Sequence, residues 1–156
     1  MDANQNLTAE MIKIDPYNYT LSEMVDVIGE TEAKKLFKSI YKGTSKLSYQ
    51  TIKEKDVFNG GDTRKYAFEL CDHYCIETVC IQRRTGTTVC VSTMVGCPVG
   101  CVFCESGKNG FIRNLTPSEI VQQIVLLREK VNRIVFMGMG EPCLLYTSPS
   151  PRDGAT

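Results

Sequence analysis

The sequence predicts an α/β protein in which a small all-α domain precedes the truncated opening of a parallel βα barrel. Amphipathic segments with helix caps occupy the first 43 residues, and strand-like runs begin after a glycine-rich turn at residues 59–62. A glycine-rich loop, an amphipathic helix and an apolar strand then follow one another between residues 96 and 137. That order is typical of a βα unit in a parallel sheet.

The N-terminal helices are predicted from their caps and their apolar spacing. Thr20 and Glu23 form a capping box that starts the first helix. A second helix is predicted from about residue 31 to residue 43, and a weaker helical pattern runs from about residue 45 to residue 53. We therefore expect a helical accessory domain over residues 1–56.

Three strand-like runs come next, over residues 65–70, 75–82 and 87–92. The turn around Thr85 and Gly86 makes the last two runs a hairpin. We expect these strands to lead into the barrel.

The following helix is predicted to begin at Thr116, because Thr116, Pro117 and Glu119 supply an N-cap, a first-turn proline and a third-position glutamate. A continuous apolar strand over residues 133–137 is expected to lie buried in the sheet. The apolar face of the helix is expected to consist of Ile120, Val121, Ile124, Val125 and Leu127.

The C-terminal segment has a different character. Residues 143–156 change abruptly to a Ser/Pro-rich stretch, and residues 143–153 match a translated transposase-type sequencing adaptor. About 50 residues lie between the cysteine loop described below and the C-terminus, whereas a complete barrel takes about 250. We therefore interpret residues 57–142 as the start of a barrel and residues 143–156 as a non-native tail, the alternative being a natural linker.

Composition narrows the class of protein. The chain has 156 residues, of which 42% are hydrophobic and 23% charged, and no apolar run approaches the roughly 20 residues of a membrane span. The polar N-terminus lacks the features of a signal peptide, so we expect a cytoplasmic location. Eight cysteines in a reducing compartment favour metal binding or catalysis over structural disulfides.

Charge gives no independent sign of a nucleic-acid partner. The formal net charge is zero, whereas nucleic-acid binders usually carry a basic excess. We interpret the lysines at positions 34, 35, 38, 42 and 46 as a solvated helix face.

The strongest motif is the cysteine loop, residues 97–104, in which Cys97, Cys101 and Cys104 supply three thiolates. Three ligands on a four-iron cluster leave one iron open, and S-adenosylmethionine can chelate that iron through its amino and carboxylate groups. Zinc is the rival interpretation, because it takes four ligands and Cys90 or His73 could supply the fourth. The spacing and the glycines around the loop favour the iron–sulfur cluster.

Three further candidates come from neighbouring segments. The glycine turn, residues 138–142, follows the apolar strand, and its backbone at Gly140 and carboxylate at Glu141 can contact the methionine end of S-adenosylmethionine. Strand alternation places Glu77 on one face with Val79 and Ile81, and a carboxylate in such apolar surroundings suits a proton acceptor. The alternative is an exposed glutamate on an edge strand.

The last candidate, Cys90, alternates with its neighbours so that it shares a face with Thr88 and Ser92. It precedes the cysteine loop by seven residues. Most lone cysteines are inert core residues, which is the alternative here.

Together these motifs resemble the RlmN/Cfr family of radical S-adenosylmethionine (radical SAM) RNA methyltransferases. The resemblance runs from about residue 62 to residue 142, with several independent motifs in the same order and matched spacing from Glu77 through the cysteine loop. They are IETV (76–79), TVCVS (88–92), VGC (95–97), CVFC (101–104), GFIRNLT (110–116), EIVQQ (119–123) and VFMGMGEP (135–142).

The resemblance implies roles for the candidate residues. Cys97, Cys101 and Cys104 would hold a 4Fe-4S cluster, and the glycine turn would contact S-adenosylmethionine through Gly140 and Glu141. Glu77 would stand where the family has its proton acceptor, and Cys90 where the family has the cysteine that forms a transient disulfide and frees the product.

The resemblance also implies a substrate and partners. The family methylates adenine in ribosomal RNA, at C2 in RlmN members, which also modify some tRNAs, and at C8 in Cfr members. A reductant such as flavodoxin or ferredoxin and a monomeric state are expected. The methyl-carrying cysteine would lie beyond Pro142, so we expect the polypeptide as written to be inactive.

Two alternatives remain open. Met94 replaces a glutamine that is common in the family, which allows a radical SAM paralogue with another substrate. A non-catalytic iron–sulfur or zinc binding protein is the other alternative.

Overall fold

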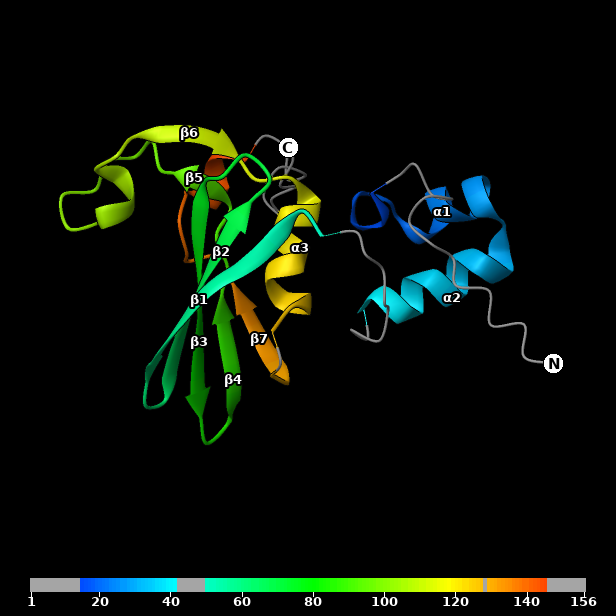
Figure 1. Ribbon diagram of the computed structural model, residues 1–156, viewed down its shortest axis with the longest axis horizontal. Helices are drawn as coiled ribbons and strands as arrows, with labels where there is room; N and C mark the ends of the chain where they lie inside the picture. Colours follow the sequence, from blue (N-terminus) through cyan, green and yellow to red (C-terminus); the bar gives the residue numbers. More distant parts are fainter. Residues whose placement is uncertain (1–14, 42–49, 128, 146–156) are drawn as a thin grey trace, which may run out of the picture.

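The computed structural model describes residues 15–41, 50–127 and 129–145, which divide between a helical unit and a sheet unit (Figure 1). The helical unit consists of the 3-10 turn η1 (Pro16–Asn18) and the helices α1 (Leu21–Ile28) and α2 (Glu30–Tyr41). A five-stranded sheet and a two-stranded sheet form the larger unit. The predicted α/β class with a preceding all-α unit is confirmed.

The main sheet has the strand order β1-β2-β3-β4-β7. Its first four strands pair antiparallel, and β7 pairs parallel with β4. The strands are β1 (Ile52–Gly60), β2 (Thr63–Leu70), β3 (Cys75–Arg83), β4 (Gly86–Cys90) and β7 (Val131–Val135). The second sheet pairs β5 (Met94–Gly96) with β6 (Phe111–Asn114).

The helical unit forms as its caps predict. Thr20 and Glu23 make both hydrogen bonds of the capping box, and Gly29 ends α1 with a φ of 82° that favours glycine. The helices enclose a small core of Met24, Ala33, Leu36 and Ile40. Within the described residues, no helix has the length and apolarity needed to cross a membrane.

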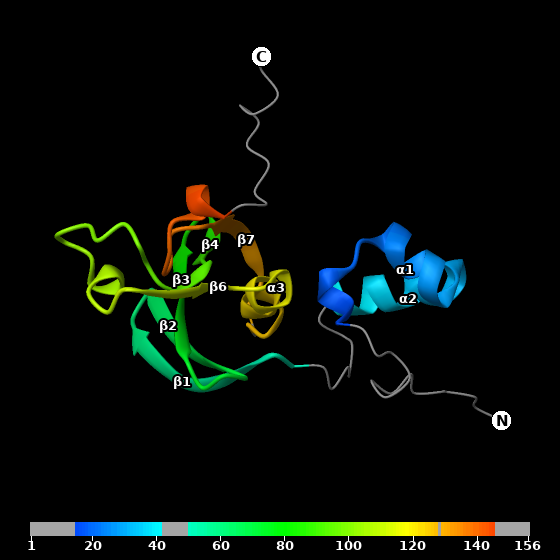
Figure 2. The ribbon, with the colours of Figure 1, turned by 90° about the horizontal axis from the view of Figure 1, so that it is seen from above.

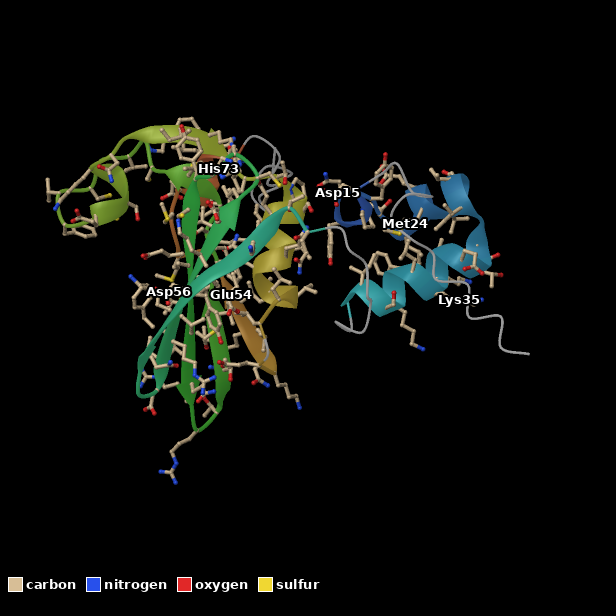
Figure 3. All side chains as sticks on the ribbon, in the orientation of Figure 1. Asp15, Met24, Lys35, Glu54, Asp56 and His73 are labelled. Atoms are coloured by element: carbon tan, nitrogen blue, oxygen red, sulfur yellow. The ribbon has the colours of Figure 1, made fainter. Side chains whose placement is uncertain are left out.

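The lysines of α2 form a solvated face, as predicted. Lys34 pairs with Glu30, and Lys35 pairs with Glu32, with both lysine side chains at least 60% exposed. Lys35 points away from the sheet unit in Figure 3. Positions 42 and 46 lie outside the described residues.

Strand β1 was not predicted. The weak helical pattern over residues 45–53 is wrong at Ile52 and Lys53, which begin β1, while residues 45–49 lie outside the described part of the chain. The strand also crosses the boundary expected between residues 56 and 57. It is stabilised by pairing with β2 and by the fully buried Ile52, contacts that lie outside any local pattern.

Helix α3 (Pro117–Val125) covers one face of the main sheet and lies between that sheet and the helical unit (Figure 2). At its first turn, the backbone N–H of Ser118 donates to Asn18 Oδ1 of η1 at 3.1 Å. This bond satisfies one of the helix's free N-terminal donors and joins the two units.

The buried face of α3 differs from the prediction. Ile120, Ile124 and Leu127 pack against the core, but Val121 and Val125 do not belong to it. The most deeply buried residues of the helix are polar. They can be buried because each one forms a hydrogen bond to a strand, to a loop or within the helix. They are Ser118, Glu119, Gln122 and Gln123.

The expectation that the strand over residues 133–137 is buried is also wrong. Among the strands that the structure describes, β7 lies at the edge of the sheet and pairs with β4 alone, and Ile134 is 47% and Phe136 50% exposed. The apolar sequence of β7 therefore predicts its parallel pairing with β4 correctly. It does not predict that the side chains of the strand are exposed.

The pairing of β4 with β7 continues beyond both strands. Val91 N donates to Val135 O, Gly138 N to Val91 O, and Thr93 N to Met139 O, over 2.8–3.1 Å. A Cβ at Gly138 would lie 2.7 Å from Ser92 N, so only glycine fits this contact.

Arg113 holds β6 against two other parts of the sheet unit. Its guanidinium donates to both carboxylate oxygens of Glu119 at 2.8 Å and to Asp72 Oδ2 at 2.7 Å. Asp72 lies in the β2–β3 turn, beside His73, which Figure 3 shows at the end of the sheet where β5 and β6 lie. Burial opposes ionisation of Glu119, but hydrogen bonds from Arg113 and Thr116 outweigh it and lower the pKa of its carboxyl.

We expect Glu119→Gln to lower the free energy of unfolding by about 2 kcal/mol at pH 7, because it removes a charged partner of Arg113. A carboxyl whose pKa falls on folding stabilises the protein above its unfolded-state pKa and loses that effect as the pH falls through the folded-state pKa. The difference between the two proteins should therefore shrink below about pH 4.5 in urea unfolding. Glu54→Gln, at an exposed residue of β1 labelled in Figure 3, is the control and should change little at either pH.

Gly138→Ala should destabilise the protein by about 1–3 kcal/mol, because the added methyl group meets backbone atoms that cannot move aside easily. Denaturant unfolding measures the effect. Gly60→Ala is a matched control, since a Cβ there would lie 3.5 Å from its nearest neighbour. Equal stability of the two variants would show that the contact between residues 92 and 138 is not tight.

Candidate functional site

The cysteine loop lies in the connection between β5 and β6, residues 97–110. Both views of the ribbon show it projecting from the sheet on the side away from the helical unit (Figures 1 and 2). Its base is closed by the β5–β6 pairing and by Cys97 N, which donates to Gly110 O at 3.2 Å. Two short β-strands therefore present all three candidate thiols from one segment.

Glycine is required at the base of the loop. Gly96 has a φ of 73°, and a Cβ there would collide with the carbonyl oxygen of Gly110. On the other side of the loop, a Cβ at Gly107 would approach Gly100 Cα to 3.0 Å. The loop is therefore compact in its backbone, which explains the glycines that surround the cysteines.

The thiols of the loop are accessible. Cys101 is exposed, whereas Cys97 and Cys104 are half-buried, and all three are free thiols. Hydrogen bonds from the backbone N–H and the hydroxyl of Ser106 lower the pKa of the Cys104 thiol, which favours the thiolate that binds metal.

The donor set fits an iron–sulfur cluster better than zinc. Three thiolates from one loop suit a cluster that keeps one iron open, because cysteine thiolates are its usual ligands. Of the two candidates for a fourth zinc ligand, Cys90 lies in β4 and His73 lies in the β2–β3 turn near Glu69. In the described part of the chain, no three His, Cys, Asp or Glu side chains converge as a metal site, so the assignment of the cysteines depends on donor type and spacing.

The glycine turn lies directly beside the segment that leads into the cysteine loop. Met139 O accepts from Thr93 N at 2.8 Å and from Met94 N at 3.2 Å. Gly140 has a φ of 101°, and a Cβ there would lie 2.7 Å from the side chain of Met94. The glycine turn is therefore in backbone contact with residues 93 and 94, from which β5 leads into the cysteine loop.

Glu141 already has a structural partner. Its Oε1 accepts from Cys143 N at 3.0 Å, which caps the 3-10 turn η3 (Pro142–Leu144) and lowers the pKa of the carboxyl. Cys143 is the first residue of the segment interpreted as a non-native tail, so this hydrogen bond is not assigned to the site.

Glu77 lies on the open face of the sheet, which is the face opposite to α3. It shares this face with Val79 and Ile81, as predicted, but the expected apolar surroundings are wrong. Its carboxylate is 48% exposed and accepts a 2.8 Å ion pair from Lys65 of β2. The reason is the register, which places Lys65 opposite Val79 and thus diagonally next to Glu77.

Cys90 lies on the same open face, one strand away. It pairs with Val79, so Glu77 and Cys90 are diagonal neighbours across β3 and β4. Burial raises the pKa of the Cys90 thiol, which keeps it protonated at neutral pH. Cys80, on the opposite face, is more deeply buried, and its pKa rises to about 12.

Three residues without a role predicted from the sequence also shape this site. Lys65 contacts Glu77, Ser92 lies between Glu77 and the glycine turn, and Gln123 binds Ser92. Met94, noted only as a departure from the family, is 1% exposed beneath Gly140. Ser92 lies in the TVCVS motif (88–92), which singled it out in the sequence. Its hydrogen bonds to residues 77, 123 and 139 could not be predicted, because they join segments that are distant in the sequence.

A family model described as the radical SAM superfamily matches residues 91–150, which include the cysteine loop and the glycine turn. A curated protein from Thermotoga neapolitana, named probable dual-specificity RNA methyltransferase RlmN, is 42% identical over 120 residues, covering 74% of this chain and 35% of the relative. A similarly named protein from Thermotoga maritima is 34% identical over 155 residues, covering 91% and 45%.

A solved structure also points to the radical SAM proteins. The crystal structure of a radical SAM methyltransferase from Sphaerobacter thermophilus aligns with a TM-score of 0.73 and 31% identity, covering 83% of this chain and 48% of that one. The chain thus spans less than half the length of these three relatives. Over the part that it covers, the chain is a member of the RlmN/Cfr-like family of radical SAM proteins.

Proposed function

We propose that the chain is part of a radical SAM methyltransferase that modifies adenine in ribosomal RNA at C2, and in some tRNAs. The observation that carries the proposal is the contact between two segments with different chemistry. The glycine turn is hydrogen-bonded to Thr93 and Met94, and β5 leads from there directly into the cysteine loop.

Cys97, Cys101 and Cys104 would hold a 4Fe-4S cluster with one iron left open for S-adenosylmethionine. When bound, such a cluster supplies one electron to the sulfonium of that ligand. The accessible thiols, the hydrogen bonds that stabilise the Cys104 thiolate and the compact loop support this assignment. Gly140 and the carboxylate of Glu141 would receive the methionine end of the same ligand.

Glu77 would accept the proton that leaves the adenine, and Cys90 would form the transient disulfide that frees the product. Their shared face supports this division of roles, because a base and a thiol on neighbouring strands can reach one substrate. No disulfide joins cysteines within the described part of the chain, and the partner thiol would be the methyl-carrying cysteine that the family resemblance implies.

Several finer points complete the proposal. The enzyme would work in the cytoplasm as a monomer, with flavodoxin or ferredoxin as the electron donor. A probable RNA methyltransferase from Rhodopseudomonas palustris, 54% identical over 87 residues that cover 56% of this chain and 24% of the relative, supports RNA as the substrate. The relatives from the two Thermotoga species are more than twice as long as the part that this polypeptide of 156 residues matches. We propose that turnover needs the rest of that length, so the polypeptide by itself would be inactive.

Anaerobic reconstitution with iron and sulfide tests the cluster assignment. We expect about four irons per chain and the loss of most bound iron in Cys97→Ala, Cys101→Ala and Cys104→Ala. Cys75→Ala, at an exposed cysteine outside the loop, is the matched control and should bind iron normally. Stoichiometric zinc in place of iron, or iron retained in all three loop variants, would contradict the proposal.

A further inference from the structure

A fully buried amide in α3 replaces the sheet hydrogen bonds where the chain leaves β4. Gln123 Oε1 accepts from Ser92 N at 2.8 Å, and Gln123 Nε2 donates to Ser92 O at 2.9 Å. Both residues are 0% exposed. Because a buried backbone N–H and C=O need partners, Gln123 fixes the backbone of Ser92 at the end of the strand.

The remaining capacity of Gln123 is also used. Its Oε1 accepts a second bond from Thr78 Oγ1 at 2.8 Å, and its Nε2 donates to Glu119 O at 3.2 Å. Thr78 belongs to β3, so one side chain connects α3 with two segments of the sheet. Such a fully satisfied network holds its members in one arrangement.

The hydroxyl of Ser92 links two parts of the candidate site. It donates to the backbone carbonyl of Glu77 at 2.5 Å and accepts from the backbone N–H of Met139 at 2.9 Å. Met139 O binds Thr93 N and Met94 N, so both backbone polar groups of Met139 bind within residues 92–94. The glycine turn is thereby fixed by Ser92 and its two successors.

We propose that Ser92 is a positioning residue for S-adenosylmethionine. Its hydroxyl, on a backbone that Gln123 holds in place, keeps the glycine turn in the shape that receives the methionine end of the ligand. The same hydroxyl ties this turn to the strand that carries Glu77. The inference rests on the proposed function, because it assumes that the glycine turn binds this ligand.

Ser92→Ala tests the inference in the reconstituted chain, with S-adenosylmethionine binding measured by equilibrium dialysis. The variant removes both hydroxyl bonds, the one from Met139 N and the one to Glu77 O, but leaves the bonds between Gln123 and the backbone of residue 92. Losing the hydrogen bond that orders the turn should raise the dissociation constant about fivefold.

Thr78→Val is the matched control. It removes a buried hydroxyl from the same network but leaves the bond between Ser92 and Met139 intact. Both variants should be less stable than the parent chain, and only Ser92→Ala should bind the ligand more weakly. Equal affinities of the parent chain and Ser92→Ala, or equal weakening in both variants, would overturn the inference while leaving the proposed function in place. If the parent chain itself binds no S-adenosylmethionine, both fail.

Hydrogen exchange in the unsubstituted chain gives a second test that does not depend on how the variant folds. The amide of Met139 should exchange slowly before any ligand is added, at a rate close to that of Val91, whose N–H binds Val135 O. An amide at Met139 that exchanges like an exposed loop until S-adenosylmethionine is present would show that the turn is not held in advance, and would overturn the inference.

Discussion

The parallel pairing of β4 with β7 is the constraint on which the rest of the site depends. It continues past the ends of both strands, so that residues 91–94 bind the backbone of residues 135–139. The cysteine loop and the glycine turn are the direct continuations of these two segments. A change in the register of this pairing would therefore separate them.

The local elements of the fold could be predicted from the sequence because their signals are local. The capping boxes at Thr20 and Thr116 and the hairpin at Gly86 need only a few neighbouring residues, and each forms as expected. Strand β1 was missed because its stability comes from pairing with β2, and the short strands β5 and β6 were missed because each needs the other. Periodicity contains no information about such partners.

The sequence predicts which segments of the chain form the site, but not which side chains contact each candidate residue. Sequence places Glu77 on the correct face, yet only the register shows that Lys65 lies next to it. Hydropathy likewise predicts that α3 buries aliphatic residues, whereas its most deeply buried residues are polar. Gln123 is buried because its amide completes the hydrogen bonding of Ser92, a requirement that arises only when the sheet and the helix meet.

The proposed chemistry requires that three loop thiolates leave one iron of a cluster open to S-adenosylmethionine. Electron paramagnetic resonance of the reduced, reconstituted chain tests it directly, with spectra recorded before and after the ligand is added. A ligand that binds the open iron changes the electronic environment of the cluster, so we expect the g-values to shift. An identical spectrum at a saturating ligand concentration would contradict the claim.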